Sequence, residues 1–149
     1  MLLSLGHRNE KGDVKINDIF SMNALQLSQG FMEGSISPIE VTELCIERAF
    51  EQSSPVYIKI TDERALSEAR ASTKRWEAKS PISCLDGVPI AWKDLINMEG
   101  EVSRAASILF EDAEPASKDA PLVSKASAAG NGLHRAIKYD RTCLFWSWL

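Results

Sequence analysis

The sequence predicts a mixed α/β fold, because segments with strand patterns alternate with segments with helical patterns. Residues 56–60 and 88–92 are short runs rich in β-branched and apolar side chains, as in strands. Residues 61–78 and 119–130 have apolar side chains spaced three and four positions apart, as in helices. The 149 residues are 44% hydrophobic and 26% charged, as in globular proteins. A chain of this length can bury roughly 70% of its unfolded surface, which is enough for one core.

Composition excludes several classes of partner and site. The formal net charge is -4, so no basic surplus indicates a nucleic-acid or membrane partner. The apolar start, residues 1–5, is too short for a signal peptide or a membrane span. Cys45, Cys84 and Cys143 are odd in number and widely spaced, and no glycine-rich nucleotide-binding motif is present. We therefore expect a cytoplasmic protein with no metal and no cofactor.

A helical hairpin is expected near the start of the chain, over residues 24–52. Gly34 is placed to end the first helix, and Ser37-Pro38-Ile39-Glu40 has the pattern of a capping box that begins the second. The predicted buried positions follow helical spacing; they are Ala24, Leu27 and Phe31 in the first helix, and Val41, Leu44, Cys45, Ala49 and Phe50 in the second. A hairpin of this kind could also bind a partner or self-associate, so a small interaction protein is an alternative function.

The next elements alternate between strand and helix. We expect Thr61 to cap the helix that follows the first strand, with Leu66, Ala69, Thr73 and Trp76 on its inner face. Lys74 and Arg75 are expected on a solvated face of that helix. Asp86-Gly87 predicts a turn before the second strand, and Asp119-Ala120-Pro121 predicts another helix cap.

The composition and the hydrophobic pattern of the sequence change after Gly130. Residues 131–149 hold two of the four tryptophans, have three basic residues against one acidic residue, and have no amphipathic period. We therefore divide the chain into a folded portion, residues 1–130, and an out-of-frame or irregular tail, residues 131–149.

Leu85-Asp86-Gly87-Val88-Pro89-Ile90-Ala91-Trp92-Lys93-Asp94-Leu95 resembles the strand-to-loop segment of amidase-signature enzymes, which act on carbon–nitrogen amide bonds. Residues 34–40 and 119–130 resemble two further family segments and occur in the family's order. The resemblance implies the N-terminal part of the amidase-signature fold, with an incomplete sheet and a small amide as substrate. It also implies that Lys93 is the base of a Ser/cis-Ser/Lys triad.

The chemistry of a serine nucleophile explains why a lysine is needed at such a position. A serine hydroxyl attacks poorly until a nearby group takes its proton, and a lysine can do so only when neutral. An apolar approach such as Ile90-Ala91-Trp92 removes water from the ammonium and favours the neutral amine. The alternative is structural, with Lys93 pairing with Asp94 or another carboxylate at the end of the strand.

The sequence also departs from the family pattern. Ala106 stands where the family commonly has a glycine, and the Ser/Gly-rich segment that supplies both catalytic serines is absent from the 149 residues. Ser103 and Ser107 lack a glycine-rich turn, and we expect them to be ordinary solvated or capping serines. The resemblance therefore implies an inactive amidase-like chain. Residues 85–95 do not separate this from a remnant of a glutamyl-tRNA amidotransferase A-type subunit.

A frameshift is our hypothesis for the unusual tail. With permitted codons for residues 131–149, reading one nucleotide later can give MVFIGQSNMTELAYSGLG, which resembles the family's strand and G-x-[ST]-N-M-x-E segment. Trp146 and Trp148 force glycines in that frame whatever the third bases elsewhere. The hypothesis predicts a single-base shift near Gly130 that ended the chain early and left apolar surface free for self-association. Sequencing the coding DNA tests it, because the shifted frame must continue into a Ser/Gly-rich segment.

Overall fold

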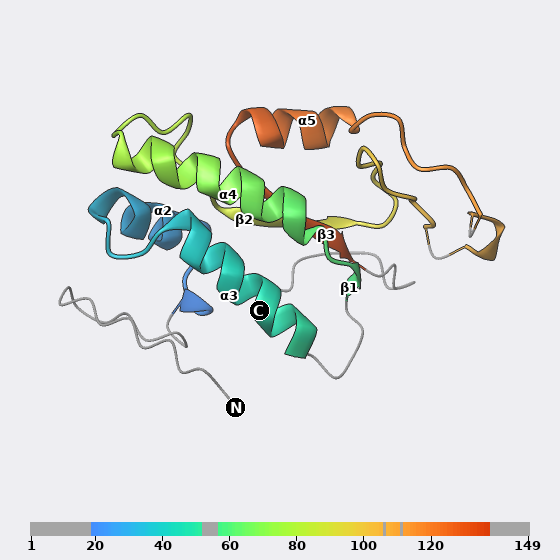
Figure 1. Ribbon diagram of the computed structural model, residues 1–149, viewed down its shortest axis with the longest axis horizontal. Coiled ribbons are helices and arrows are strands. Elements are labelled where there is room, and N and C mark those ends of the chain that lie inside the picture. The colour runs from blue at the N-terminus through green and yellow to red at the C-terminus, as the bar shows by residue number, and fades with distance from the viewer. Residues whose placement is uncertain (1–18, 52–56, 106, 111, 138–149) are drawn as a thin grey trace.

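The computed structural model describes residues 19–51, 57–105, 107–110 and 112–137 as helices, strands and connecting loops (Figure 1). The elements, in chain order, are α2 (Ala24–Glu33), α3 (Pro38–Glu51), β1 (Tyr57–Lys59), α4 (Asp62–Glu77), β2 (Pro89–Lys93), the 3₁₀ turn η1 (Ile108–Phe110), α5 (Pro121–Ala128) and β3 (Gly132–Ile137). The predicted mixed architecture, with a helical hairpin ahead of strand, helix and strand, is confirmed.

The predicted hairpin is formed by α2 and α3, and both of its inner boundaries are as expected. Gly34 ends α2 in a left-handed conformation (φ 69°) and its N–H donates to the carbonyl of Phe31. At the start of α3, the backbone N–H of Ser37 donates to the Glu40 carboxylate (2.8 Å), and the Glu40 N–H donates to Ser37 Oγ (3.3 Å). The capping box is therefore confirmed.

One predicted core residue of α3 is not in the core. Val41 is buried, with 1% of its surface exposed, but Phe50 is 67% exposed. The last turn of α3 lies at the lower edge of the molecule in Figure 1, away from α2. Helical periodicity identifies a common face, whereas burial also requires a neighbour along the whole length of that face.

Helix α4 begins where expected, but the predicted side-chain cap is missing. Thr61 stands at the N-cap position, yet its side chain makes no capping hydrogen bond. Asp62 and Glu63 lie in the first turn, where their charges favour the positive end of the helix. The fully buried side chains of α4 are the small ones of Ala65, Ala69 and Ser72, which allow close approach of neighbouring elements.

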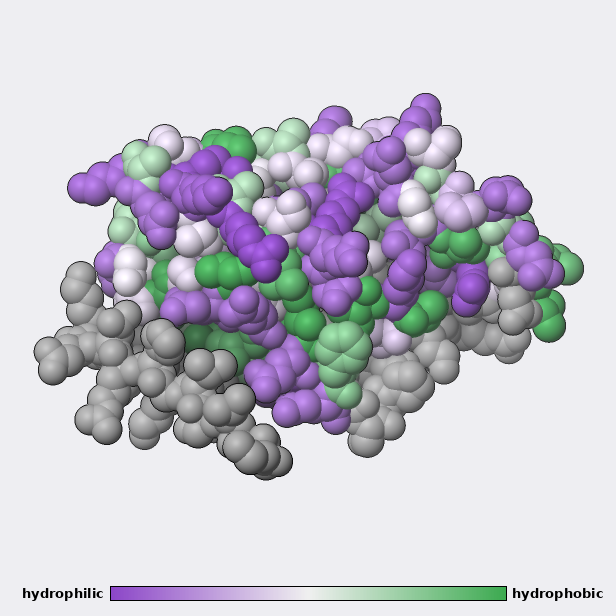
Figure 2. All heavy atoms as spheres, in the orientation of Figure 1, coloured by the Kyte–Doolittle hydropathy of each residue, from purple (hydrophilic) through white to green (hydrophobic). Residues whose placement is uncertain are grey.

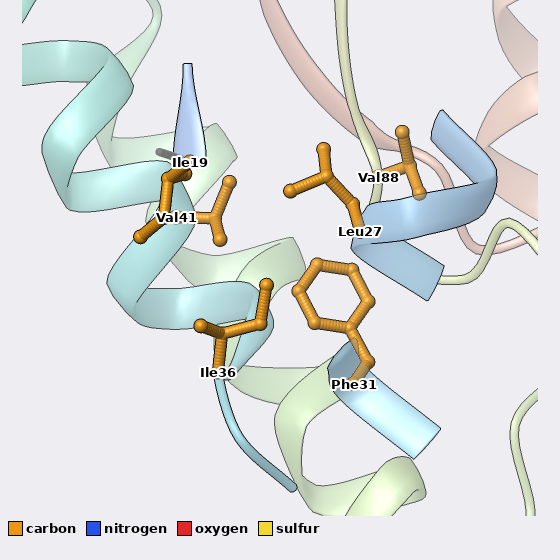
Figure 3. Close-up of a cluster of buried hydrophobic side chains, with 6 residues drawn as sticks. All are labelled: Ile19, Leu27, Phe31, Ile36, Val41 and Val88. Carbon is orange, nitrogen blue, oxygen red and sulfur yellow. The ribbon is translucent and has the colours of Figure 1, made fainter. Parts of the chain in front are cut away.

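Two apolar clusters form the core. Figure 3 shows the first, in which side chains from α2 and α3 meet those of the flanking segments; its members are Ile19, Leu27, Phe31, Ile36, Val41 and Val88. Trp76 of α4 packs against this cluster, with its ring 6.2 Å from that of Phe31. In the second cluster, Trp92 of β2 and Val123 of α5 pack with Met98.

The sheet has the order β1-β3-β2, with β3 antiparallel to β1 and parallel to β2. Both pairings contain a register shift; along β2, Ile90 and Trp92 are two residues apart, whereas their partners Leu133 and Ala136 are three apart. Residues 132–137 fall in the segment expected to be out of frame or irregular, and the six of them form a strand. Residues 138–149 lie outside the described residues.

Candidate catalytic site at the end of strand β2

Lys93 is the last residue of β2 and is half-buried. It pairs in register with Ile137, the last residue of the parallel neighbour β3. In open α/β sheets, functional side chains gather beyond the carboxyl ends of parallel strands, so Lys93 occupies a favourable position. Of the expected apolar approach Ile90-Ala91-Trp92, Trp92 is buried (8% exposed) and Ile90 is half-buried, but Ala91 is exposed.

The loop after Lys93 folds back over the end of the strand. The N–H of Ile96 donates to the carbonyl of Lys93 (3.0 Å), and the N–H of Ala105 donates to the carbonyl of Asp94 (2.8 Å). The side chain of Asp94 takes part as well, because its Oδ1 accepts from the N–H of Arg104 (3.2 Å). Asp94 is 2% exposed, so this carboxylate is an interior group of the loop.

A pocket of about 280 Å³ lies between the loop and β1; Asp94 lines it, whereas Lys93 does not. Its walls include Lys59 from β1, Asp94 at the strand end, and Ser103 and Arg104 from the returning loop. An ion pair between Lys59 Nζ and Glu101 Oε2 (2.6 Å) joins β1 to the loop across the pocket wall. The pocket therefore combines both signs of charge with a hydroxyl group.

The two serines of this loop make local hydrogen bonds. The hydroxyl of Ser103 donates to the carbonyl of Ile96 (3.3 Å), and Ser107 Oγ accepts from the N–H of Leu109 (3.3 Å). The second contact is a serine turn at the start of η1. Both contacts are those of serines that organise a loop.

Asp86, which the sequence marked only as part of a turn, is fully buried and anchors the turn that leads into β2. Its carboxylate accepts two hydrogen bonds from Arg75, Nε to Oδ2 (2.7 Å) and Nη2 to Oδ1 (2.6 Å), and one from the N–H of Ile82 (2.9 Å). The expectation that Arg75 faces solvent is therefore wrong, because its guanidinium turns toward a buried carboxylate. Burial alone would raise the pKa of Asp86, but these hydrogen bonds outweigh it and hold the pKa below its ordinary value.

A second ion pair fixes the segment that leads into α5. The helix start predicted at Asp119-Ala120-Pro121 is confirmed, with Ala120 at the N-cap position and Pro121 as the first helical residue, but no side chain caps the helix. The carboxylate of Asp119 instead accepts from Arg64 Nη1 (2.9 Å) and Nη2 (2.6 Å), and from the N–H of Glu99 (2.8 Å). The hydrogen bonds from Arg64 lower the pKa of Asp119, against a smaller effect of burial.

Helix α4 therefore holds two of the connecting segments around it. Arg75, in its last turn, fixes the turn before β2, and Arg64, near its start, fixes the segment before α5. The partners are 11 and 55 positions apart in the sequence. In the sequence, these ion pairs show only as an aspartate in an Asp-Gly turn and as arginines among the polar positions of a helix. Neither feature specifies which residue is the partner.

Comparison with known proteins identifies the family. The family model described as Amidase matches residues 40–133, which is more than half of the chain. The A-type subunit of the mitochondrial glutamyl-tRNA(Gln) amidotransferase of Ornithorhynchus anatinus is 34% identical over 91 residues, covering 60% of this chain and 17% of the relative. The corresponding protein of Drosophila pseudoobscura pseudoobscura is 34% identical over 106 residues, covering 70% and 21%. The chain thus spans about a fifth of the length of these curated relatives.

A solved structure agrees with this result. It is the inhibitor-bound form of a vestigial protein complex connected with the origins of an s-triazine catabolic enzyme, and it aligns with a TM-score of 0.75 at 29% identity. The alignment covers 80% of this chain and 26% of that one. Within the described residues, every helix is too short or too polar to cross a bilayer. On the strength of the matched segment and the shared fold, the chain belongs to the amidase family.

Proposed function

We propose that the chain is the N-terminal part of an enzyme that cleaves or transfers small amides, and that Lys93 is the base of its triad. The observation that supports this most is the place of Lys93 at the carboxyl end of β2, inside the segment matched by the family model. We also propose that the protein is cytoplasmic, and we propose neither a membrane partner nor a nucleic-acid partner.

The proposed role of Lys93 is proton transfer. Neutral Lys93 would accept the proton of a serine hydroxyl, directly or through a second serine, while the serine oxygen forms a bond to the amide carbon. The proton would then pass to the nitrogen as the carbon–nitrogen bond breaks. The 149 residues supply the amine but not the Ser/Gly-rich segment, so we propose that this chain alone is inactive.

We also propose that the family sequence extends to about Gly130 and that residues 131–149 are out of frame. The end of the family match at residue 133 supports this boundary. Replacing residues 131–149 by MVFIGQSNMTELAYSGLG should raise the midpoint of thermal unfolding, and an equal or lower midpoint contradicts the proposal.

An assay of the purified 149-residue chain tests the inactivity. We expect no hydrolysis of a chromogenic aryl amide, with an intact amidase assayed beside it as the positive control. Turnover that Lys93→Ala abolishes would refute the inactivity while supporting the role of the lysine. Turnover that Lys93→Ala leaves unchanged would contradict both parts.

A graft tests the lysine itself. Residues 40–130 would replace the matched segment of a full-length A-type amidotransferase subunit. We expect the graft to retain activity and Lys93→Ala to lower kcat by roughly 10³-fold or more, because triad members act as a unit. Lys125→Ala, an exposed lysine on α5, is the matched control and should leave kcat unchanged.

A remnant of a glutamyl-tRNA amidotransferase A-type subunit is the second candidate function. It is favoured by the names of the relatives, which are A-type subunits of that enzyme. In the graft, release of ammonia from glutamine at the rate of the parent protein would support this branch. Activity confined to simple aryl amides would support the general amidase branch.

Self-association is the interaction that we propose for the isolated chain. Three consecutive residues of η1 are exposed and apolar: Ile108 (82%), Leu109 (86%) and Phe110 (49%). Contiguous apolar surface of this kind promotes contact between molecules.

A further inference from the structure

Asp94, the residue after the proposed base, has a set of contacts that closes the loop beyond β2. Its Oδ1 accepts from the N–H of Arg104 (3.2 Å) and its carbonyl accepts from the N–H of Ala105 (2.8 Å). One residue therefore binds two successive backbone groups that lie ten and eleven positions later in the chain. The side chain of Asp94 is buried (2% exposed), like that of Trp92 two residues earlier (8% exposed), whereas Lys93 between them is half-buried.

The segment that Asp94 holds is conformationally strained. Ala105 has a positive φ of 48°, a conformation that side chains with a Cβ adopt at a cost. Such residues persist only where the surroundings hold them, and they are concentrated at functional sites. Here the surroundings include the two hydrogen bonds to Asp94.

The second oxygen of the Asp94 carboxylate is buried and has no hydrogen-bond partner among the described residues. Buried polar atoms without a partner are rare and lower stability, so a residue chosen for stability alone would not be expected here. Asp94, Ser103 and Arg104 also line the 280 Å³ pocket, so the position of this turn sets the shape of the pocket wall.

We infer that Asp94 is a positioning residue, which holds the Ser103–Ala105 turn against the end of β2 and thereby fixes both the pocket wall and the strand end that carries Lys93. The inference rests on the proposed function of Lys93. Asp94 does not transfer a proton in this scheme. Its role is to hold the loop in one geometry, so that the amine at the end of β2 occupies a fixed position.

Hydrogen exchange and lysine labelling of the complete 149-residue chain test the inference. In Asp94→Ala we expect the Arg104 and Ala105 amides to exchange at least tenfold faster. We also expect Lys93 to react at least threefold faster with an acylating reagent, as read by mass spectrometry. Asp94→Asn keeps an oxygen acceptor for the Arg104 N–H and should restore both rates to within twofold of the wild type.

The controls separate a local from a global effect. Asp112→Ala, an exposed aspartate in the following loop, should change neither rate, and Lys125 should react equally in all variants. Asp94→Leu is a second variant that removes the carboxylate acceptor but keeps a side chain of similar size, and it serves if Asp94→Ala unfolds the chain. The inference would be overturned if Asp94→Ala or Asp94→Leu folds and leaves the exchange and labelling rates unchanged, or if both variants unfold.

The graft of residues 40–130 separates failure of this inference from failure of the proposed function. If Lys93→Ala removes activity and Asp94→Ala leaves kcat and KM unchanged, the base assignment stands and the positioning role fails. If Lys93→Ala has no effect, the proposed function fails, while the exchange and labelling rates still report whether Asp94 holds the turn.

Discussion

At the scale of single residues, the ion pair between Arg75 and Asp86 is the one in which an acidic partner is completely buried among the described residues. Asp86 is completely buried and Arg75 is about a quarter exposed (27% for its side chain), so the pair lies at the edge of the interior. Removing one partner of such a pair leaves the other partner without its hydrogen bonds, which costs more than the pair contributes when intact.

We expect Asp86→Ala to lower the free energy of unfolding by about 3 kcal/mol, because Arg75 and the Ile82 N–H lose their acceptor together. Denaturant unfolding measures the change. Glu101→Gln is the control, since it weakens the more exposed pair with Lys59 and should cost less than about 1 kcal/mol. Equal effects of the two substitutions would contradict the special role of Asp86.

The same carboxylate makes stability depend on pH. The pKa values of Asp86 and Asp119 are both lowered in the folded state, so the unfolded state binds more protons as the pH falls. Their contribution is complete above the ordinary aspartate pKa of about 3.9 and is lost as the pH falls through the lowered folded values. Urea midpoints should therefore decrease from pH 6 to pH 3. Asp86→Asn should make that decrease smaller; a decrease of the same size would show that Asp86 is not a cause.

At the scale of elements, close packing at the C-terminal end of α5 depends on a glycine. Gly130 has φ 85°, and a Cβ built there would lie 2.7 Å from Asp86 Cγ. Gly34 ends α2 with φ 69°, but a Cβ there would meet nothing within 4 Å. The two glycines therefore share the conformational requirement and differ in the space around them.

We expect Gly34→Ala to cost about 1 kcal/mol, the ordinary penalty for alanine in a left-handed conformation. Gly130→Ala should cost at least about 2 kcal/mol more, because the added methyl group displaces the Asp86 carboxylate from Arg75. The difference between the two unfolding free energies isolates the contact with Asp86. Equal costs would show that the site relaxes freely around the methyl group.

At the scale of the whole molecule, apolar side chains reach the surface where no described element covers them. Figure 2 shows hydrophobic atoms at the right-hand end of the molecule, where Figure 1 places η1. The chain matches only 26% of the length of the solved relative, so a surface that is exposed here need not be a surface of the longer proteins.

We expect the double substitution Ile108→Ser and Leu109→Ser to reduce self-association of the purified chain, as measured by sedimentation velocity across a range of concentrations. Leu25→Ser is the matched control, because Leu25 of α2 is also exposed (68%) but is a single apolar residue on a helix. Similar behaviour of the two variants would show that η1 is not the contact surface.

Short-range chemistry explains which features were predictable. Gly34, the Ser37–Glu40 capping box and the Asp86-Gly87 turn depend on partners within a few residues, and these were predicted correctly. The apolar run of residues 88–92 placed Lys93 at a strand end, where the structure also has it, whereas its catalytic role comes from the family resemblance and stays a proposal. Phe50 and Thr61 show the limit, because periodicity and cap propensity do not specify neighbours.

The sequence by itself determined where helices begin and end, which faces are apolar and which strand delivers Lys93, because each depends on interactions among nearby residues. Only the tertiary structure decided that Asp86 is buried against Arg75, that Asp119 binds Arg64, and that Asp94 holds a turn ten residues later. Those contacts form between segments that the fold brings together. The identity of a charged residue does not indicate which distant partner makes its burial possible.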